Sequence, residues 1–371
     1  MQITGAVLER SGAPAPFAGS RPFTVQTLEL DAPARGELLV RIEVAGVCHS
    51  DLSVVDGNRV RPTPMLLGHE AAGIVEAIGD GVMDVALGDR VVMTFLPRCG
   101  VCPGCLTDGR LPCEVGTAAN TDGTLVGGGI RLHRAAADGS IQDVHHHLGV
   151  SAFATHAVVS RTSVVPVDAD VPADVAALLG CAVLTGGGAV LNAGRPRPGE
   201  PVLVIGLGGV GMAALLVAVA LGHEVIGVDA VDAKLELARE LGATGALSPS
   251  AAAASGIRAP VVIEAAGAVR AFETAVALTA PGGTTVTVGL PAPDARASVS
   301  PLQLTAEART VVGSYLGSAV PSRDIPRYVD LWRAGRLPLE RLVSSRIPLE
   351  RIDEAMDRLA AGGELRQLIQ F

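Results

Sequence analysis

The chain has 371 residues, of which 49% are hydrophobic and 18% are charged, and its formal net charge is -9. This length exceeds what a single hydrophobic core usually organises, so we expect a globular protein of two domains. Lysine and arginine are scattered along the chain. Nucleic acids and anionic membranes bind a concentrated basic face, so small molecules are the expected partners.

No secretory or membrane-spanning segment is predicted. Glu9 and Arg10 interrupt the N-terminus before an apolar core of signal length develops. The longest apolar stretch, residues 212–221, is about half the length of a membrane span. We therefore expect a soluble, cytoplasmic protein.

Residues 1–180 are predicted to form a β-rich domain. Short apolar and β-branched runs alternate with turns that contain Pro and Gly, as in ELLVRIEVAGV, AAGIVEAIG, DRVVMTF and HAVVSRTSVVPV. Between Glu114 and Val144 the chain is rich in Gly and Ala and has weak periodicity, so this stretch is expected to be a long loop.

Four of the six cysteines follow the pattern CxxCxxCx7C. Four thiolates this close in the chain can close a tetrahedral shell around one zinc ion, and a closed shell has no room for substrate. Such tight spacing in a cytoplasmic protein favours metal ligands over disulfides. The predicted ligands of this structural zinc are Cys99, Cys102, Cys105 and Cys113.

The two remaining cysteines and one histidine suit a second zinc. Cys48 lies in GVCHSDL, His69 in LLGHEAAG and Cys181 in LLGCAVLTGGG. One imidazole and two thiolates leave the fourth position of a tetrahedral zinc open for substrate. The sequence therefore predicts two zinc ions per chain, one structural and one catalytic.

Residues 181–315 are predicted to form an α/β domain. The strands PVLVIG, EVIGVD, VVIEAAG and TTVTVGL alternate with the helical stretches GVGMAALLVAVALG, AKLELARELGA and RAFETAVALTA. This alternation predicts a doubly wound parallel sheet with right-handed crossovers.

Gly206, Gly208 and Gly211 form a GxGxxG motif between a predicted strand and a predicted helix. These glycines allow a tight turn, the approach of a pyrophosphate to the backbone, and close packing of helix on strand. Asp229 ends the next strand, where a carboxylate accepts hydrogen bonds from the adenosine ribose and repels a 2′-phosphate. The motif predicts a dinucleotide site with NAD favoured over NADP.

Residues 316–371 hold two helical stretches, IPRYVDLWRAGR and ERIDEAMDRLAAG, and end in LRQLIQF. This segment has too little apolar surface to fold alone. We expect it to pack back onto the first domain.

These motifs together resemble the zinc-dependent medium-chain alcohol dehydrogenase family over essentially the whole chain. The resemblance is carried by GVCHSDL, LLGHEAAGIVEAIGDGV, CGVCPGC, LLGC followed by LTGGG, GLGGVG and GGELRQLIQF. It implies an α/β protein with a GroES-like β-rich catalytic domain and a Rossmann nucleotide-binding domain. The chain looks most similar to the branch with a long loop after the structural zinc, whose members are commonly dimers, so a homodimer is expected.

The resemblance also implies roles for single residues near the catalytic zinc, which Cys48, His69 and Cys181 would bind. Glu70 and Asp51 would support this zinc. Ser50 would take the proton of the alcohol. The implied substrate pocket comprises Ser50, Arg59, Phe95, His147, Leu148, Leu290 and Leu316.

Further positions are implied to bind the NAD cofactor. His49 and Arg366 would contact its phosphates, and Lys234 would lie beside its adenosine. The remaining implied positions are Thr185, Gly206, Gly208, Gly209, Val210, Gly211 and Asp229.

Three positions depart from the family pattern. Ser53 stands where a histidine commonly acts as the outer proton acceptor, and a hydroxyl is a poor base at neutral pH. Arg59 and His147 stand where an aliphatic and an aromatic residue are common. Two interpretations stay open: this pair contacts a polar or carboxylate-bearing part of the substrate, or Arg59 faces solvent and residues 145–147 form a histidine-rich loop.

The resemblance implies reversible hydride transfer between an alcohol and NAD, giving an aldehyde or ketone. A thiol-adduct formaldehyde dehydrogenase of the glutathione type is an alternative, with Arg59, Arg61 and Arg110 as possible cationic groups. A catalytically idle NAD-binding protein and a zinc-free reductase of activated double bonds are further alternatives. Neither needs the complete set of zinc ligands, which argues against both.

Overall fold

The structure, a computed structural model, describes residues 1–136 and 138–371. The chain forms two compact units. Unit 1 comprises residues 1–107, 112–181 and 343–371, and unit 2 comprises residues 108–111 and 182–342.

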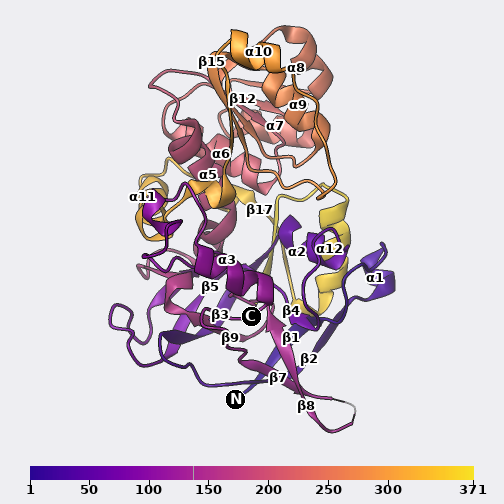
Figure 1. Cartoon of the computed structure of the whole chain (residues 1–371), viewed down its shortest axis with the longest axis vertical. Coiled ribbons are helices and arrows are strands. Elements are labelled where there is room, and N and C mark those ends of the chain that lie inside the picture. Colours follow the sequence, from indigo (N-terminus) through magenta and orange to yellow (C-terminus); the bar gives the residue numbers. More distant parts are fainter. Residues whose placement is uncertain (137) are drawn as a thin grey trace. The chain divides into compact units, whose positions relative to one another are not determined.

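Unit 1 is built on a closed barrel and an open sheet (Figure 1), which confirms the expected β-rich domain. The barrel strands, in order, are β1 (Gln2–Leu8), β2 (Phe23–Leu30), β7 (Leu132–Ala135), β8 (Ile141–His146) and β4 (Met65–Leu66). The open sheet runs β10 (Val164–Val167), β6 (Arg90–Met93), β5 (Glu70–Ile78), β3 (Glu37–Val47), β18 (Arg366–Gln370) and β17 (Val343–Ile347), and β9 (His156–Ser160) also pairs with β3.

The helices of unit 1 are short, and the last of them returns to the N-terminal part of the chain. They are α1 (Phe17–Ser20), α2 (His49–Val55), α3 (Glu114–Asp122), α4 (Ala173–Leu178) and α12 (Ile352–Ala360). In Figure 1 the yellow α12 lies beside the indigo α1. Asp357 of α12 accepts hydrogen bonds from the backbone N–H groups of Phe17, at 2.6 Å, and Ala18, at 2.9 Å.

The stretch from Glu114 to Val144 is not the long loop that its composition suggests. It contains helix α3 and the antiparallel strands β7 and β8. The sulfur of Cys113 caps α3 by accepting a hydrogen bond from Gly116 N. β7 and β8 have few buried apolar residues, Leu132 and Val144 among them, so the alternation that marks a strand is weak here.

Unit 2 contains the predicted doubly wound parallel sheet. Its strand order is β13 (Gly245–Leu247), β12 (Val225–Val228), β11 (Val202–Ile205), β14 (Ala259–Glu264), β15 (Thr279–Thr287) and β16 (Thr310–Gly313), and every pairing is parallel. Its helices are α5 (Leu184–Gly188), α6 (Gly209–Ala220), α7 (Asp232–Glu240), α8 (Pro249–Ser255), α9 (Val269–Ala277), α10 (Pro301–Ala306) and α11 (Pro321–Arg333). The strand order reverses between β11 and β14, which is where such sheets bind ligands.

The C-terminal segment divides at Val343 instead of returning as a whole to the first domain from residue 316. Helix α11 belongs to unit 2, because Asp324 and Tyr328 are fully buried there. The carboxylate of Asp324 accepts hydrogen bonds from Val320 N at 2.9 Å and from Asn192 Nδ2 at 3.2 Å. The sequence shows that α11 has an apolar face but does not show what covers it.

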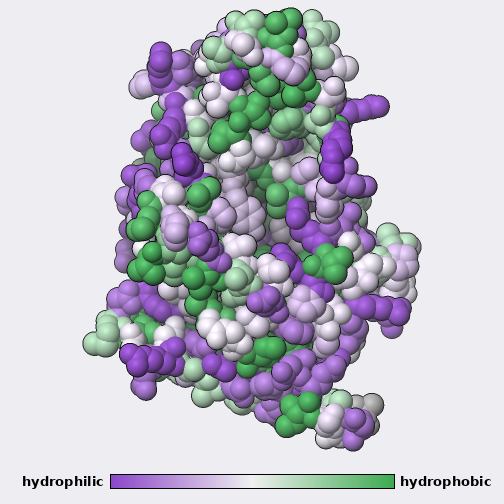
Figure 2. Space-filling view, viewed as in Figure 1, coloured by the Kyte–Doolittle hydropathy of each residue, from purple (hydrophilic) through white to green (hydrophobic). Residues whose placement is uncertain are grey.

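One helical stretch in the described part of the chain, Ala173–Gly194, has the length and composition of a membrane span. Its apolar window is 89% buried inside the protein, as is common for a core helix. On the face seen in Figure 2, hydrophobic residues are interspersed with hydrophilic ones.

His133 joins two carboxylates at the barrel. Its Nε2 lies 3.0 Å from an oxygen of Asp31, and its Nδ1 lies 2.9 Å from an oxygen of Asp143. Burial opposes a positive charge here, but the hydrogen bonds and charges of Asp31 and Asp143 outweigh it and raise the pKa of His133. The protonated imidazole therefore binds β7 to β8 and to the residue after β2.

We predict that this contact makes stability depend on pH. Because the folded pKa of His133 lies above the unfolded value of about 6.5, its contribution is fully present below about pH 6.5 and is lost as pH rises through the folded pKa. The free energy of unfolding should therefore fall more steeply with rising pH in the wild type than in His133→Gln. Urea unfolding across this range measures both slopes, and parallel slopes would contradict the prediction.

Candidate functional site

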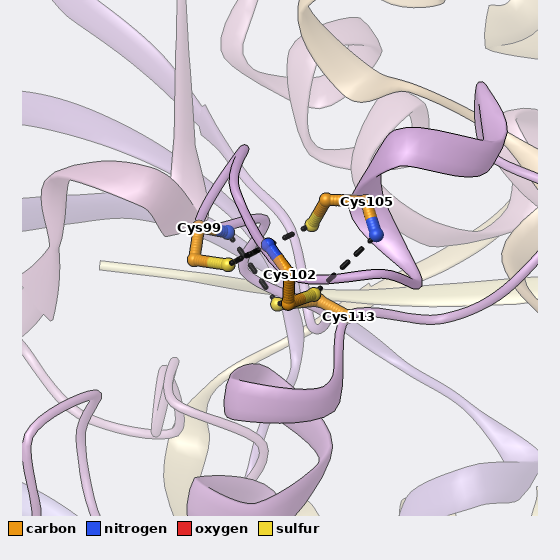
Figure 3. A group of neighbouring side chains, drawn as sticks. All are labelled: Cys99, Cys102, Cys105 and Cys113. Atoms are coloured by element: carbon orange, nitrogen blue, oxygen red, sulfur yellow. Dashed lines mark hydrogen bonds between the residues drawn. The ribbon is translucent and has the colours of Figure 1, made fainter.

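The four clustered cysteines direct their sulfur atoms toward one centre (Figure 3). The sulfurs of Cys99 and Cys105 are 3.9 Å apart, as are those of Cys102 and Cys113. Four thiolates held tetrahedrally at about 2.3 Å from zinc lie about 3.8 Å from one another. The quartet therefore has the size of a zinc–thiolate shell, and all four cysteines are free thiols.

Backbone N–H groups donate hydrogen bonds to sulfurs of this quartet and so favour the thiolate form, which binds cations. Cys105 N donates a hydrogen bond to the Cys102 sulfur at 3.4 Å, which lowers the pKa of Cys102 to about 6. Burial raises the pKa of Cys105 to about 12. The backbone hydrogen bond and burial thus favour opposite protonation states in these two neighbours. A bound cation would remove this conflict, as a coordinated thiol is deprotonated.

A second set of ligand atoms comes from three distant parts of the chain. Cys48 joins β3 to α2, His69 precedes β5, and Cys181 follows α4. Their ligand atoms all lie within 4.8 Å of one another, with 3.4 Å between His69 Nε2 and the Cys181 sulfur. A tetrahedral zinc with bonds of about 2.3 Å to sulfur and about 2.0 Å to nitrogen requires about 3.5 Å between those atoms. The three residues therefore fit a zinc with one open position.

Burial of the three ligands and the contact between the two sulfurs both favour metal binding at this set. Cys48, His69 and Cys181 are 5%, 0% and 4% exposed. The hydrogen bond from Cys181, aided by the charges of Arg366 and His69, lowers the pKa of Cys48 well below its ordinary value despite burial. The same contact raises the pKa of Cys181. The contact thus favours the thiolate form of Cys48, which is the form that binds metal.

Asp51 connects the parts of the chain that carry two of these ligands. One of its oxygens lies 2.9 Å from His69 Nδ1 and accepts from Gly68 N at 3.2 Å, and the other accepts from Cys48 N at 3.1 Å. The side chain is fully buried. Burial alone would raise the pKa of Asp51, but the charge of His69, the hydrogen bond from His69 and the nearby His147 ring lower it. The ionised carboxylate fixes the His69 ring so that Nε2 faces the sulfurs.

Glu70 and Arg366 form a buried ion pair next to the same set. Arg366 Nε donates to Glu70 at 3.2 Å, and both side chains are almost fully buried. Pairing of β3 with β5 sets Gly46 opposite Glu70, and a Cβ on Gly46 would lie 2.4 Å from the Glu70 carboxylate. Only glycine at position 46 leaves room for the Glu70 carboxylate. One terminal guanidinium nitrogen of Arg366 is buried without a partner among the described residues, so it has a donor for an anion such as a phosphate.

The glycine motif of unit 2 has the geometry that a dinucleotide requires. Gly206 has a φ of +88°, which favours glycine, and a Cβ on Gly211 would lie 1.7 Å from the carbonyl oxygen of Gly206. Gly208 has open space where its side chain would be, and helix α6 begins directly after it. The carboxylate of Asp229 is held by Leu207 N at 2.7 Å and Val231 N at 2.9 Å.

Glu264 is a site residue that the sequence analysis did not single out. It ends β14 and is 1% exposed. Its carboxylate accepts hydrogen bonds from Ala266 N at 2.9 Å, Gly267 N at 2.7 Å and the Thr287 hydroxyl at 2.8 Å. It therefore shapes the loops at the carboxyl ends of β14 and β15. An acidic residue ending the apolar run VVIE was the available signal.

Comparisons with known proteins agree with this geometry. Residues 34–169 match the alcohol dehydrogenase GroES-like domain and residues 209–333 match the zinc-binding dehydrogenase family. The putative alcohol dehydrogenase D of Mycobacterium tuberculosis is 36% identical over 380 residues, with 100% of both chains covered. The NDMA-dependent alcohol dehydrogenase of Amycolatopsis methanolica is 36% identical, with 100% of this chain and 99% of that protein covered.

The crystal structure of benzyl alcohol dehydrogenase from Acinetobacter calcoaceticus matches with a TM-score of 0.89 and 31% identity, over 100% of this chain and 99% of that chain. This chain belongs to the zinc-dependent medium-chain alcohol dehydrogenase family. It is an enzyme that acts as a zinc-dependent alcohol oxidoreductase, as the predicted resemblance implied. These relatives do not favour a thiol-adduct dehydrogenase, an idle binding protein or a zinc-free reductase.

Several expected pocket residues of this alcohol dehydrogenase lie beside the zinc ligands of unit 1. The ring of Phe95 meets the His69 ring edge to face, with centroids 5.5 Å apart. The ring of His147 does the same at 5.6 Å, and its Nδ1 lies 3.2 Å from Asp51. Leu148, which follows it, is 6% exposed. A neighbouring carboxylate thus partly explains a polar side chain at position 147.

The other expected positions lie elsewhere in unit 1 or belong to unit 2. His49 is exposed at the start of α2, Ser50 follows it, and Arg59 is half-buried. Thr185, Lys234, Leu290 and Leu316 belong to unit 2, and their exposure ranges from buried Leu316 and Thr185 to 50% exposed Leu290.

We predict that each chain binds two zinc ions, because the two ligand sets share no residue and each fits the metal. Metal analysis of the purified protein should give a ratio close to two. A ratio near one after zinc supplementation, with Cys48 open to alkylation, would contradict this prediction.

We predict different consequences when each set is broken. Cys48→Ala should abolish turnover while the protein stays folded and binds NAD, because unit 2 is unchanged. Cys102→Ala should lower thermal stability, because a structural zinc contributes folding free energy. Melting temperature, dinucleotide binding and activity separate the two variants, and identical behaviour would show that the assigned division is wrong.

Proposed function

We propose that this enzyme oxidises an alcohol to an aldehyde or ketone with NAD, and catalyses the reverse reaction, with one catalytic zinc and one structural zinc per chain. The observation that carries this proposal is the buried set of Cys48, His69 and Cys181, oriented by Asp51. A zinc with an open position acidifies an alcohol hydroxyl when bound there. The cysteine quartet offers no such open position.

The residues of unit 1 would position the alcohol and take its proton. We propose that Ser50, two residues after Cys48, would take the proton of the alcohol while it passes its own hydroxyl proton on to water. Bound NAD would supply the acceptor for the hydride. Phe95, His147 and Leu148 would line the site on the side of His69. The hydroxyl of Ser53 donates to the His49 carbonyl at 2.8 Å, which supports a proton route through cofactor hydroxyls and water instead of Ser53.

The proposed NAD site includes the glycine loop of unit 2. Gly206, Gly208, Gly209, Val210 and Gly211 would bind the pyrophosphate at the start of α6. The unpartnered nitrogen of Arg366 supports its expected phosphate contact. His49, Lys234 and Thr185 remain proposed cofactor contacts.

We predict that Asp229 sets the preference for NAD. Two backbone N–H groups hold its carboxylate, so the negative charge that repels a 2′-phosphate has a fixed position. Asp229→Asn should weaken NAD binding and improve NADP binding in relative terms. The ratio of catalytic efficiencies with the two cofactors measures this, and equal use of both by the wild type would exclude the assigned role.

A cytoplasmic homodimer is also proposed. Strand β16 ends the parallel sheet, with a neighbour, β15, on one side only in the described chain. Its residues Thr310 and Val311 are exposed, and Leu302 nearby in α10 is 76% exposed. An exposed strand edge with apolar neighbours favours pairing with a second copy.

A direct assay tests the proposed reaction. Benzyl alcohol is a suitable first substrate because a related structure is a benzyl alcohol dehydrogenase. We expect the wild type to form NADH, which is followed by the absorbance of the reduced nicotinamide, and we expect none with Cys48→Ala. Because one relative is named for NDMA dependence, the assay is run with and without NDMA. Absence of turnover of any alcohol or aldehyde by zinc-loaded protein would refute the proposal.

A further inference from the structure

Arg61 is an arginine with a buried polar atom that the rest of the described chain leaves without a partner. Its Nε carries one N–H, and no acceptor lies within hydrogen-bond distance of it among residues 1–136 and 138–371. Burying such a donor unpaired is unfavourable, so positions like this usually have an external acceptor.

His145 presents a second unpaired nitrogen in the same region. Its Nδ1 is buried and has no partner in the described structure. His145 N donates to the Pro64 carbonyl at 2.9 Å. Pro62 and the His145 ring lie 2.8 and 3.1 Å from the point where a Cβ on Gly123 would stand. The segment that carries Arg61 therefore runs directly beside His145, and Gly123 leaves room between them.

This region adjoins the catalytic ligands. His147, two residues after His145, has its Nδ1 3.2 Å from Asp51 and its ring 5.6 Å from the ring of the zinc ligand His69. His145 belongs to β8, which leads directly to His147. The Arg61 segment, which runs beside His145, is therefore close to the catalytic ligands.

We propose that Arg61 and His145 form an anion subsite beside the catalytic set, and that the natural alcohol or aldehyde carries a carboxylate which this subsite binds. The proposal rests on the proposed function and adds the substrate class to it. A carboxylate offers two acceptor oxygens, one for an arginine N–H and one for an imidazole N–H. A neutral substrate tail would leave both nitrogens unpaired.

Arg61 and Arg59 differ in their surroundings. Arg59 departs from the family pattern, but the buried unpaired donor belongs to Arg61. Both side chains carry one positive charge in the same segment. Arg59→Met is therefore a charge-matched control for Arg61→Met, because a general electrostatic effect would appear equally in both.

The test compares benzyl alcohol with 4-(hydroxymethyl)benzoate, which differ by one carboxylate on an otherwise common skeleton. With the wild type we expect a lower KM for the carboxylate substrate. Arg61→Met should raise that KM about ten- to a hundredfold with little change in kcat, the pattern for a contact equally strong in ground and transition states. Its KM for benzyl alcohol should change little, and Arg59→Met should not reproduce this selective loss on the carboxylate substrate.

Several outcomes would overturn the subsite. They are equal losses on the two substrates, equal losses in the two arginine variants, or a wild type with no preference for the carboxylate substrate. Calorimetric binding of 4-formylbenzoate and benzaldehyde to the holoenzyme, with the Arg61→Lys variant as a conservative comparison, tests the subsite without turnover. Absence of turnover of both alcohols would count against the proposed function, whereas equal binding of both aldehydes would count against the subsite alone.

Discussion

The buried carboxylate of Asp51 is the interaction on which the metal site depends. It binds the backbone of Cys48 and Gly68 and lies against the rings of His69 and His147, so it connects three separate segments of unit 1. A buried carboxylate is stable only with such donors, and each donor lost would cost about 1 to 3 kcal/mol. The same contacts that keep Asp51 ionised therefore hold two zinc ligands in place.

Glu264 and Asp229 in unit 2 are also carboxylates held by backbone N–H groups, but they order loops of the parallel sheet instead of zinc ligands. Each is a carboxylate at the end of a parallel strand that accepts backbone N–H groups of nearby loops. Backbone donors position a negative charge without long side chains, so the loops at the carboxyl edge of the sheet are shaped from within. The ion pair of Glu70 and Arg366 has a related role in unit 1, where it ties the C-terminal strand β18 to β5.

Much of the site was predictable from spacing because its chemistry is local in sequence. The cysteine quartet, the glycine motif and the acidic residue after the second strand carry their meaning in the order of residues. The alternation of strands and helices predicted the parallel sheet for the same reason. Helix α3 was missed because its capping residue is a cysteine and its flanking strands carry few buried side chains.

The sequence by itself determined the kinds of ligand, the two fold types and the family. Only the tertiary structure decided which side chains meet. The β3–β5 register places Glu70 over Gly46, strand β18 brings Arg366 to that pair, and His147 comes to lie against Asp51. Helix α11 joined unit 2 because Asp324 and Tyr328 are buried there. Such contacts join residues that are far apart in the chain. The local secondary-structure propensity of a segment does not predict its strand register or its burial against a distant segment.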